Sequence, residues 1–336
     1  MVTLRDIAKK AGVSTAAVSL YINGKGKGRI SPATGEKIRL AIDALEYHPR
    51  QAQTLLHKMT AGIKTVAIYW ASDIRASLLG EVMAGMQECI QFEYLSHLNI
   101  IIKPYKINEL YKEKELLQPN YYDGVIISNT SSMDMQYLDT VQPPAPTVLL
   151  NRYSPHYNTV MLDNPAVGRS VAQMMKDRGF ASAAIFRTMD PFLGVNQRLL
   201  GFIDGCRDLH IQIHNEAQFI GQNSVEGGME AARQFLTLPE YPPVIFADTD
   251  WLALGSLYVF HKAGIKIPED VSIIAIGQNV LSAARCSIPA LSTLDIPLRN
   301  LASSCLSLLS ELMYSKVTGP IHRQIQPELH LRESFQ

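Results

Sequence analysis

The chain has 336 residues, 47% of them hydrophobic and 18% charged, which excludes a disordered protein and predicts two or three globular domains. Residues 1–60 carry ten Lys and Arg against four Asp and Glu, a net charge of +6, and the remainder carries −6 because the whole chain is neutral. A basic head joined to an acidic body is typical of a nucleic-acid-binding module attached to a second domain.

The basic head has the pattern of three short helices. Apolar residues recur at helical spacing over residues 4–11, and Gly12 can then end the first helix in the left-handed conformation. Ser14 can cap a second helix over residues 15–22, and the pair Ser31-Pro32 is typical of the start of a third. A helix, a turn centred on glycine and a second helix together predict a helix-turn-helix, which is a DNA-binding motif.

The loop from Asn23 to Arg29 is rich in glycine and lysine. Such a composition also occurs in loops that cradle nucleotide phosphates, so a nucleotide site is an alternative interpretation. The loop lacks the G-x-x-x-x-G-K-[ST] spacing, however, and it does not join a strand to a helix. We therefore interpret it as a flexible basic loop of the DNA-binding head.

Several segments of the head match one known domain in order and position: Val2–Ser14, Ala17–Ser19, Asn23, Ile30–Thr34 and Glu46–Pro49. They resemble the DNA-binding domain of the lactose-repressor (LacI/GalR) family. The resemblance implies that the second helix enters the DNA major groove, with Thr15, Ala16 and Leu20 facing the bases. Because these side chains are small or apolar, we expect methyl and shape contacts instead of pairing between arginine and guanine.

The same resemblance implies which residues hold the DNA backbone and which segment bends the DNA. The expected phosphate contacts are Ser14, Ser19, Asn23, Arg29, Ser31, Thr34 and Tyr47. The expected interface is completed by Leu4 and Arg50. Residues 50–58 match the family's hinge helix, and Leu56 stands where a leucine wedge enters the minor groove. Gln53 replaces the usual alanine, a longer side chain that weakens the expected contact between two hinge helices. We assign residues 1–48 to the helix-turn-helix domain and residues 49–60 to the hinge helix and linker.

The remaining chain alternates short apolar runs with helical patterns. The runs that predict buried strands are Thr65–Trp70, Asn99–Pro104, Gly124–Ser128, Thr147–Leu150, Ala183–Phe186, Phe219–Ile220, Val244–Ala247 and Val271–Ile276. They form two series of alternating strands and helices, so we expect an α/β body of two doubly wound lobes with parallel sheets. Such lobes bind ligands at the carboxyl ends of their strands.

Landmarks in the body also resemble the LacI/GalR family, though more loosely than the head does. They are Asn158–Val160, Asp163–Asn164, Gly168, Gly179–Phe180, Arg198–Phe202, Asp250, Ala253–Gly255, Asp270–Ile273, Gly277, Pro289–Thr293 and Leu331–Ser334. The resemblance implies a periplasmic-binding-protein type I fold for residues 61–336, the effector-binding and dimerisation domain, in which the chain passes between the lobes three times. We expect a first lobe of about residues 61–160 and 291–320, and a second of about 161–290 and 321–336.

Six residues are candidates for binding an effector between the lobes: Arg198, Asn279, Asn151, Asp250, Trp70 and Arg75. By the resemblance, Arg198 matches an arginine that grips hydroxyls or carboxylates of effectors. Asn279 stands where an aspartate is usual, which removes a strong acceptor for sugar hydroxyls. Asn151 lies at another position that faces the cleft in the family, and Asp250 matches a ligand or helix-cap position.

The aromatic and charged parts of this cleft leave alternatives open. Leu78 replaces a residue that is commonly aromatic in the family, so Trp70 or Trp251 would have to supply a stacking surface unless both belong to the core. If Arg75 faces the cleft, we expect an anionic effector such as a sugar phosphate. The alternative is that Arg75 is a solvated loop residue.

Missing motifs disfavour several other classes of function. The body has no G-x-G-x-x-G, H-E-x-x-H or G-x-S-x-G motif, and its histidines show no metal spacing, so we expect no enzyme, no cofactor and no metal. The four cysteines form no C-x-x-C pair, which predicts neither a disulfide framework nor a zinc site. The N-terminus lacks a signal-peptide pattern and no apolar run is long enough to span a membrane, so we expect a cytoplasmic protein and not a transport binding protein.

These features together predict a sequence-specific DNA-binding transcriptional regulator, and specifically a repressor. We expect a homodimer that binds a near-palindromic double-stranded operator and responds to a small molecule, a sugar or sugar phosphate. The alternative is the same regulator controlled by a protein co-regulator instead of a metabolite. No leucine-heptad tail follows Ser334, so we do not expect a tetramer.

Overall fold

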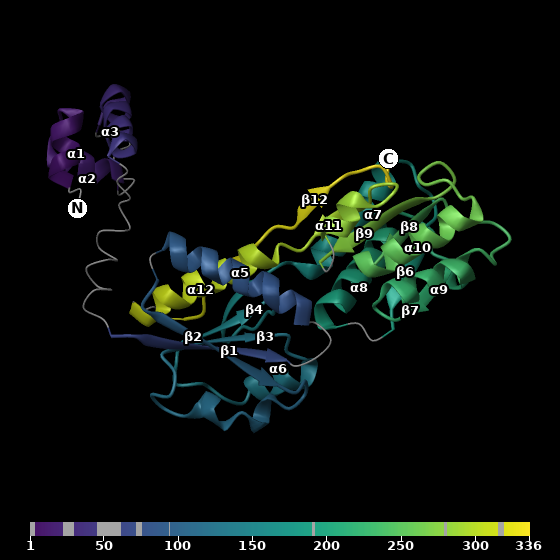
Figure 1. Ribbon diagram of the computed structural model, residues 1–336, viewed down its shortest axis with the longest axis horizontal. Helices are drawn as coiled ribbons and strands as arrows, with labels where there is room; N and C mark the ends of the chain where they lie inside the picture. Colours follow the sequence, from purple (N-terminus) through teal and green to yellow (C-terminus); the bar gives the residue numbers. More distant parts are fainter. Residues whose placement is uncertain are drawn as a thin grey trace. The chain divides into compact units, whose positions relative to one another are not determined.

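The computed structural model describes residues 4–22, 30–45, 62–71, 76–93, 95–189, 192–278, 281–314 and 319–336. The chain divides into two compact units, residues 1–63 with 92–97 and residues 64–91 with 98–336. The first unit contains the helical head, and the second contains the α/β body (Figure 1). Within the described ranges, no helix is both long and apolar enough to cross a membrane.

The head consists of three short helices around a small apolar core. They are α1 (Leu4–Ala11), α2 (Thr15–Ile22) and α3 (Pro32–Ala44). The buried core residues are Ile7, Ala8, Ala11, Val18, Ile38 and Ala41. Gly12 takes a φ of +64°, which favours glycine, and the Val13 N–H then donates to the Ala8 carbonyl at 3.0 Å. This tight turn sets α2 against α1, as the sequence pattern predicts.

The first lobe of the body is built on a six-stranded parallel sheet of order β11-β5-β4-β3-β1-β2. Its strands are β1 (Lys64–Ala71), β2 (Leu98–Tyr105), β3 (Gly124–Ser128), β4 (Thr147–Leu150), β5 (Asn158–Met161) and β11 (His322–Gln324). Its helices are α5 (Ala76–Phe92), α6 (Ser132–Leu138), α12 (Leu298–Tyr314) and the 3₁₀ turns η1 (Leu110–Lys112) and η2 (Lys114–Leu117). Figure 1 shows α5 and α12 on one side of the sheet and α6 on the other. The central strands β1, β3 and β4 are therefore buried on both faces, which agrees with their near-continuous apolar runs, whereas the edge strand β2 is partly exposed.

The second lobe has a six-stranded sheet of order β12-β10-β9-β8-β6-β7. Its strands are β6 (Ala184–Thr188), β7 (Gln218–Gly221), β8 (Val244–Ala247), β9 (Ser272–Gly277), β10 (Ser292–Asp295) and β12 (Glu328–His330). Its helices are α7 (Asn164–Asp177), α8 (Leu193–Asp208), α9 (Val225–Phe235), α10 (Asp250–Ala263), α11 (Leu281–Cys286) and the 3₁₀ turn η3 (Asn215–Ala217). Phe202 of α8 stacks on Phe246 of β8 with ring centroids 4.2 Å apart, while Phe235 and Phe260 of α9 and α10 pack against Phe186. The sheet is parallel except at its edge, where β12 runs antiparallel to β10.

The chain passes between the lobes three times, but two of the crossings lie later in the sequence than we expect. Strand β10 belongs to the second lobe, whereas the sequence assigns residues 291–320 to the first. Strand β11 belongs to the first lobe, whereas the sequence assigns residues 321–336 to the second. The cause is pairing with remote strands: Ser292 aligns with Ile274 of β9, and His322 aligns with Thr159 of β5. The crossings therefore fall between β5 and α7, between β10 and α12, and between β11 and β12.

Helices α7 and α8 approach each other closely beside the second sheet. A Cβ atom at Gly168 would overlap the carbonyl oxygen of Arg198 and the backbone nitrogen of Phe202. Only glycine lets the two backbones come this close. The close approach brings the amino-terminal parts of both helices together, and these parts carry Asn164 and Arg198.

Candidate functional site

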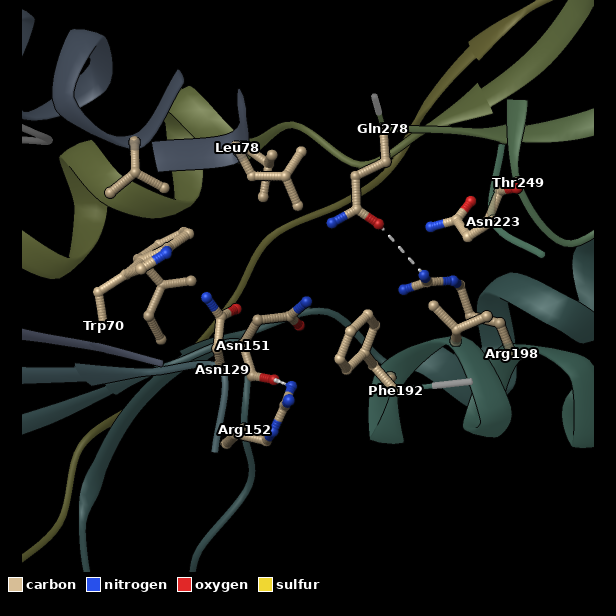
Figure 2. Close-up of a pocket in the computed structure, with 15 residues that line it drawn as sticks. Trp70, Leu78, Asn129, Asn151, Arg152, Phe192, Arg198, Asn223, Thr249 and Gln278 are labelled. Atoms are coloured by element: carbon tan, nitrogen blue, oxygen red, sulfur yellow. Dashed lines mark hydrogen bonds between the residues drawn. The ribbon is translucent and has the colours of Figure 1, made fainter. Parts of the chain in front are cut away.

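A cavity that is open to solvent lies between the two lobes of the body. The ends of strands in both sheets contribute to its walls: Trp70 is near the end of β1, Leu150 ends β4, and Gln278 directly follows β9. Figure 2 shows side chains from both lobes converging on this space. In open α/β sheets the carboxyl ends of the strands are where ligands bind, so the fold itself identifies this cavity as the candidate site.

Arg198 is the central charged group of the cavity. Its side chain is buried, with 2% of its surface exposed. Nη1 donates to Asn164 Oδ1 at 2.8 Å, Nη2 donates to Gln278 Oε1 at 3.4 Å, and Nε is buried without a hydrogen-bond partner. Both of these acceptors are neutral amide oxygens. Burial lowers the pKa of Arg198 to about 10, although the Asp248 carboxylate opposes this shift.

A chain of amide groups connects the first lobe to Arg198. Asn151 directly follows β4 with a φ of +54°, and its Oδ1 accepts hydrogen bonds from the Leu162 N–H at 3.3 Å and from Asn164 Nδ2 at 3.5 Å. Asn164 begins α7 and accepts from Arg198 through its own Oδ1. Asn151 and Arg198 therefore lie on opposite lobes but are linked through one intermediate side chain.

Four polar atoms around the cavity are buried without a hydrogen-bond partner: Asn129 Nδ2, Arg198 Nε, Asn223 Oδ1 and Thr249 Oγ1. Buried polar groups in folded proteins are satisfied in about nine cases in ten, because an unmet group costs free energy. These groups are donors and acceptors that a polar ligand or bound water can satisfy. Figure 2 shows Asn129 on the side of the first lobe and Asn223 and Thr249 on that of the second.

The two aspartates near the cavity lie behind its wall. Asp248 is buried and its Oδ2 accepts from the Thr188 N–H at 2.8 Å and from Thr188 Oγ1 at 3.0 Å. Burial raises the pKa of Asp248 to about 6. Asp250 is fully buried and its Oδ2 accepts from the Gln278 N–H at 3.1 Å. Among the described residues that line the cavity, the charged side chains are Arg152 and Arg198, so the charge carried by the lining itself is positive.

The structure brings together three of the six residues that the sequence singles out. Arg198, Asn151 and Trp70 all line the cavity, and Trp70 is 5% exposed. Asp250, the first residue of α10, does not line the cavity, because its carboxylate accepts a hydrogen bond from the backbone N–H of Gln278. The other two, Asn279 and Arg75, lie outside the described residues.

Other lining residues are not predicted from the sequence: Asn129, Arg152, Phe192, Asn223, Thr249 and Gln278. A usable signal exists for two of them, since Asn129 directly follows β3 and Gln278 directly follows β9. A polar residue placed immediately after a buried parallel strand lies at the ligand edge of the sheet. Phe192 precedes α8 and supplies an aromatic face from the second lobe. Arg152 donates from Nε to the Thr130 carbonyl at 2.9 Å.

In the head, two of the expected phosphate contacts also cap helices. Ser14 Oγ accepts from the Ala17 N–H at 3.2 Å, and Ser31 Oγ accepts from the Thr34 N–H at 3.1 Å. Thr15 and Ala16 are exposed at the start of α2. The half-buried residues of the expected interface are Leu4, Ser19, Leu20 and Thr34. The remaining expected contacts, Asn23, Arg29, Tyr47, Arg50 and Leu56, lie outside the described residues.

Two family models match the chain, one for each part. The model for bacterial regulatory proteins of the lacI family matches residues 3–50, and that for the periplasmic binding protein-like domain matches residues 172–335. A LacI family transcription regulator from Clostridium acetobutylicum, known as a crystal structure, is 32% identical over 80% of this chain and 99% of its own, with a TM-score of 0.76. The chain belongs to the LacI family. Members of this family are transcriptional regulators, which confirms the prediction of a DNA-binding regulator that is not an enzyme.

Two further LacI-family relatives match almost the whole chain. The Bacillus subtilis (strain 168) protein named "Probable HTH-type transcriptional repressor ExuR" is 28% identical over 93% of this chain and 92% of its own. The structure titled "transcriptional regulator CelR-cellobiose complex" covers 99% of this chain and 100% of its own at 21% identity, with a TM-score of 0.67. The family fold therefore extends over both the head and the body.

Proposed function

We propose that this protein is a transcriptional repressor whose operator affinity is lowered by a small sugar-like molecule bound between the lobes. The observation that carries the proposal is the cluster of unmet buried polar atoms in the cleft, to which both lobes contribute. A regulator of the same fold that is known as a complex with cellobiose supports a saccharide as the class of effector.

The arrangement of the lobes supports control through a change in their relative angle. A ligand that bridges Asn129 of the first lobe and Asn223 of the second favours whichever lobe angle brings both within hydrogen-bond reach. The chain enters the body from the head at the first lobe. A change in the angle between the lobes therefore shifts the point at which the head is attached relative to the second lobe. A few kcal/mol of difference in ligand affinity between two lobe angles is enough for useful control.

For the DNA-binding part, we propose that two copies pair and insert two α2 helices into successive major grooves. Thr15 and Ala16 are exposed on α2 and would face the bases, while Ser14 and Ser31 would meet phosphates. Pairing through the body is supported by β2, which is an edge strand and leaves Ile101 about one-third exposed. A mass measurement that gives a monomer at micromolar concentration would contradict the pairing.

Substitution of Arg198 tests the proposal directly. The operator is first selected from a random duplex library with the purified full chain, and its release is then titrated with sugars and sugar derivatives. We expect Arg198→Ala to bind the operator like the wild-type protein and to lose its release by the effector. A matched control is Arg207→Ala, since Arg207 lies exposed on the same helix α8 and should leave both properties unchanged. Persistence of effector response in Arg198→Ala would count against the cleft as the sensing site.

A further inference from the structure

We infer that the effector is a sugar acid, a polyhydroxylated molecule whose carboxylate pairs with Arg198 by displacing the side chain of Gln278. This inference rests on the proposed function, because it assigns a chemical class to the ligand of the same cleft. Three features of the site carry it. Arg198 is a buried cation whose hydrogen-bond acceptors are neutral, one edge of its guanidinium lacks a strong acceptor, and Gln278 covers this edge only through a long contact.

The first feature is a buried cation whose hydrogen-bond acceptors are neutral. Arg198 donates to two amide oxygens, and the nearby Asp248 carboxylate favours the guanidinium through its charge but directs its Oδ2 to Thr188. Taking a guanidinium out of water is costly unless an anion pairs with it. The other charged residue that lines the cavity is Arg152, so an anionic ligand meets two cations and no lining carboxylate among the described residues.

The second feature is the geometry of the free donors. Nη1 of Arg198 is occupied by a short bond of 2.8 Å to Asn164, whereas Nε has no partner and Nη2 makes only a 3.4 Å contact. Nε and Nη2 form one edge of the planar guanidinium, and two parallel donors on one edge match the two oxygens of a carboxylate. A phosphate can bind the same edge through two of its oxygens, but its third oxygen then has to find donors elsewhere in the cavity, so a carboxylate is the better match.

The third feature is the side chain of Gln278, which covers this edge but holds it weakly. Figure 2 shows the side chain of Gln278, which follows β9 of the same lobe, directed toward Arg198. The 3.4 Å contact is near the upper limit for a hydrogen bond. The backbone of Gln278 is fixed by Asp250, so its side chain can swing aside without moving the strand end. In the free protein the amide oxygen of Gln278 therefore stands in for a ligand oxygen.

The rest of the cavity suits the hydroxylated part of a sugar acid. Asn129, Asn223 and Thr249 offer unmet amide and hydroxyl groups, which pair with alcohols. Trp70 and Phe192 lie on opposite sides of the space and give apolar surfaces for the C–H faces of the carbon chain or ring. The ligand would thus be anchored by its carboxylate at the second lobe and held by hydroxyls from both lobes.

Two substitutions of Gln278 with opposite expected effects test the inference. Gln278→Glu places an internal carboxylate against the free edge of Arg198, so the variant should fold and melt at or above the wild-type temperature but lose acid binding by about 100-fold or more. Gln278→Met keeps the length of the side chain but removes the competing amide oxygen, so it should bind the acid several-fold more tightly. Calorimetric titration of the full chain measures both affinities.

The ligands for this titration are aldonic, uronic and aldaric acids of five and six carbons, each paired with its uncharged aldose or alditol, together with glucose 6-phosphate. We expect at least one acid to bind the wild-type protein about tenfold or more tightly than its uncharged partner and to release the operator. Equal binding of the uncharged partners, preference for the phosphate, or acid binding that survives in Gln278→Glu overturns the inference while leaving the proposed function intact. If no compound, charged or uncharged, binds the cleft or changes operator affinity, the proposed function fails as well.

Discussion

The head and the cleft are assembled over very different distances along the chain. In the head, Ser14 and Ser31 each cap a helix by bonding a residue three positions away. In the cleft, Arg198 contacts Asn164, 34 positions away, and Gln278, 80 positions away. A site whose residues bond near neighbours in the sequence can therefore be recognised from a sequence motif. A site whose residues come from distant parts of the chain depends on how whole helices and strands pack.

The largest effect that tests this contrast is expected at Gly168. Gly168→Ala should lower the free energy of unfolding of the body by about 3 kcal/mol and weaken effector binding, because the added methyl overlaps backbone atoms of α8 that position Arg198. Gly80→Ala is the matched control: Gly80 lies in α5 with no atom near its missing Cβ, so alanine should be neutral or stabilising by up to about 1 kcal/mol. Denaturant unfolding measures both. Equal stability of the two variants would show that the close approach of α7 and α8 is not required.

A smaller effect is expected from the pH dependence of the buried Asp248. Burial raises the pKa of Asp248 to about 6 from an ordinary value of 3.8, so the folded state holds the proton more tightly than the unfolded state does. Its contribution to stability is therefore fully present below about pH 4 and is lost as the pH rises through 6. Asp248→Asn removes this loss. The stability of the variant minus that of the wild-type protein should rise by about 2 to 3 kcal/mol between pH 4 and pH 7, as measured by urea unfolding. If the difference in unfolding free energy between the two proteins does not change with pH, the pKa of Asp248 is not raised in the folded state.

The smallest effect is expected in the head, where Ser14 caps α2. Ser14→Ala removes the N-cap of α2 and should destabilise the head by about 1 kcal/mol, with lower operator affinity. Ser14→Asp keeps a capping acceptor but adds a negative charge where we expect a DNA phosphate. The aspartate variant should therefore retain the stability of the head and still lose operator affinity. If both variants bind the operator like the wild-type protein, Ser14 is a cap and does not contact DNA.

Most of the body's strands could be predicted, because they are short apolar runs, and the central ones are buried on both faces. Gly124–Ser128, Thr147–Leu150 and Val244–Ala247 coincide with β3, β4 and β8. The strands that were not predicted have only three or four residues. Among them, β11 is recognisable only by its partner, since His322 bonds Thr159, which lies 163 positions earlier. No local pattern indicates a pairing over that distance, which is why the lobe boundary near residue 321 was wrong. The boundary near residue 291 was wrong because β10, with four residues, was not recognised as a strand that extends the second sheet beside β9.

The cleft was predicted in part for the same reason. Arg198 and Asn151 were identified by their resemblance to family positions, and Trp70 was a candidate to replace an aromatic residue that Leu78 displaces; all three line the cavity. Gln278 was missed, although its position directly after β9 could have identified it. Gln278 matters because it covers an edge of Arg198 whose donors lack strong hydrogen-bond acceptors. Which donors lack acceptors can be known only from the packed structure. A sequence gives the types of polar groups near a site, but not which of them remain without partners.

The interleaving of the lobes has a consequence for how the protein is made. Strand β11 completes the first sheet and β12 completes the second, and Phe335 is buried against Phe180 with ring centroids 5.9 Å apart. Neither lobe can finish folding on the ribosome until residues 322–336 have left the exit tunnel, whereas the head emerges first. A message cut short near its end would therefore yield a polypeptide with an intact DNA reader and no working sensor.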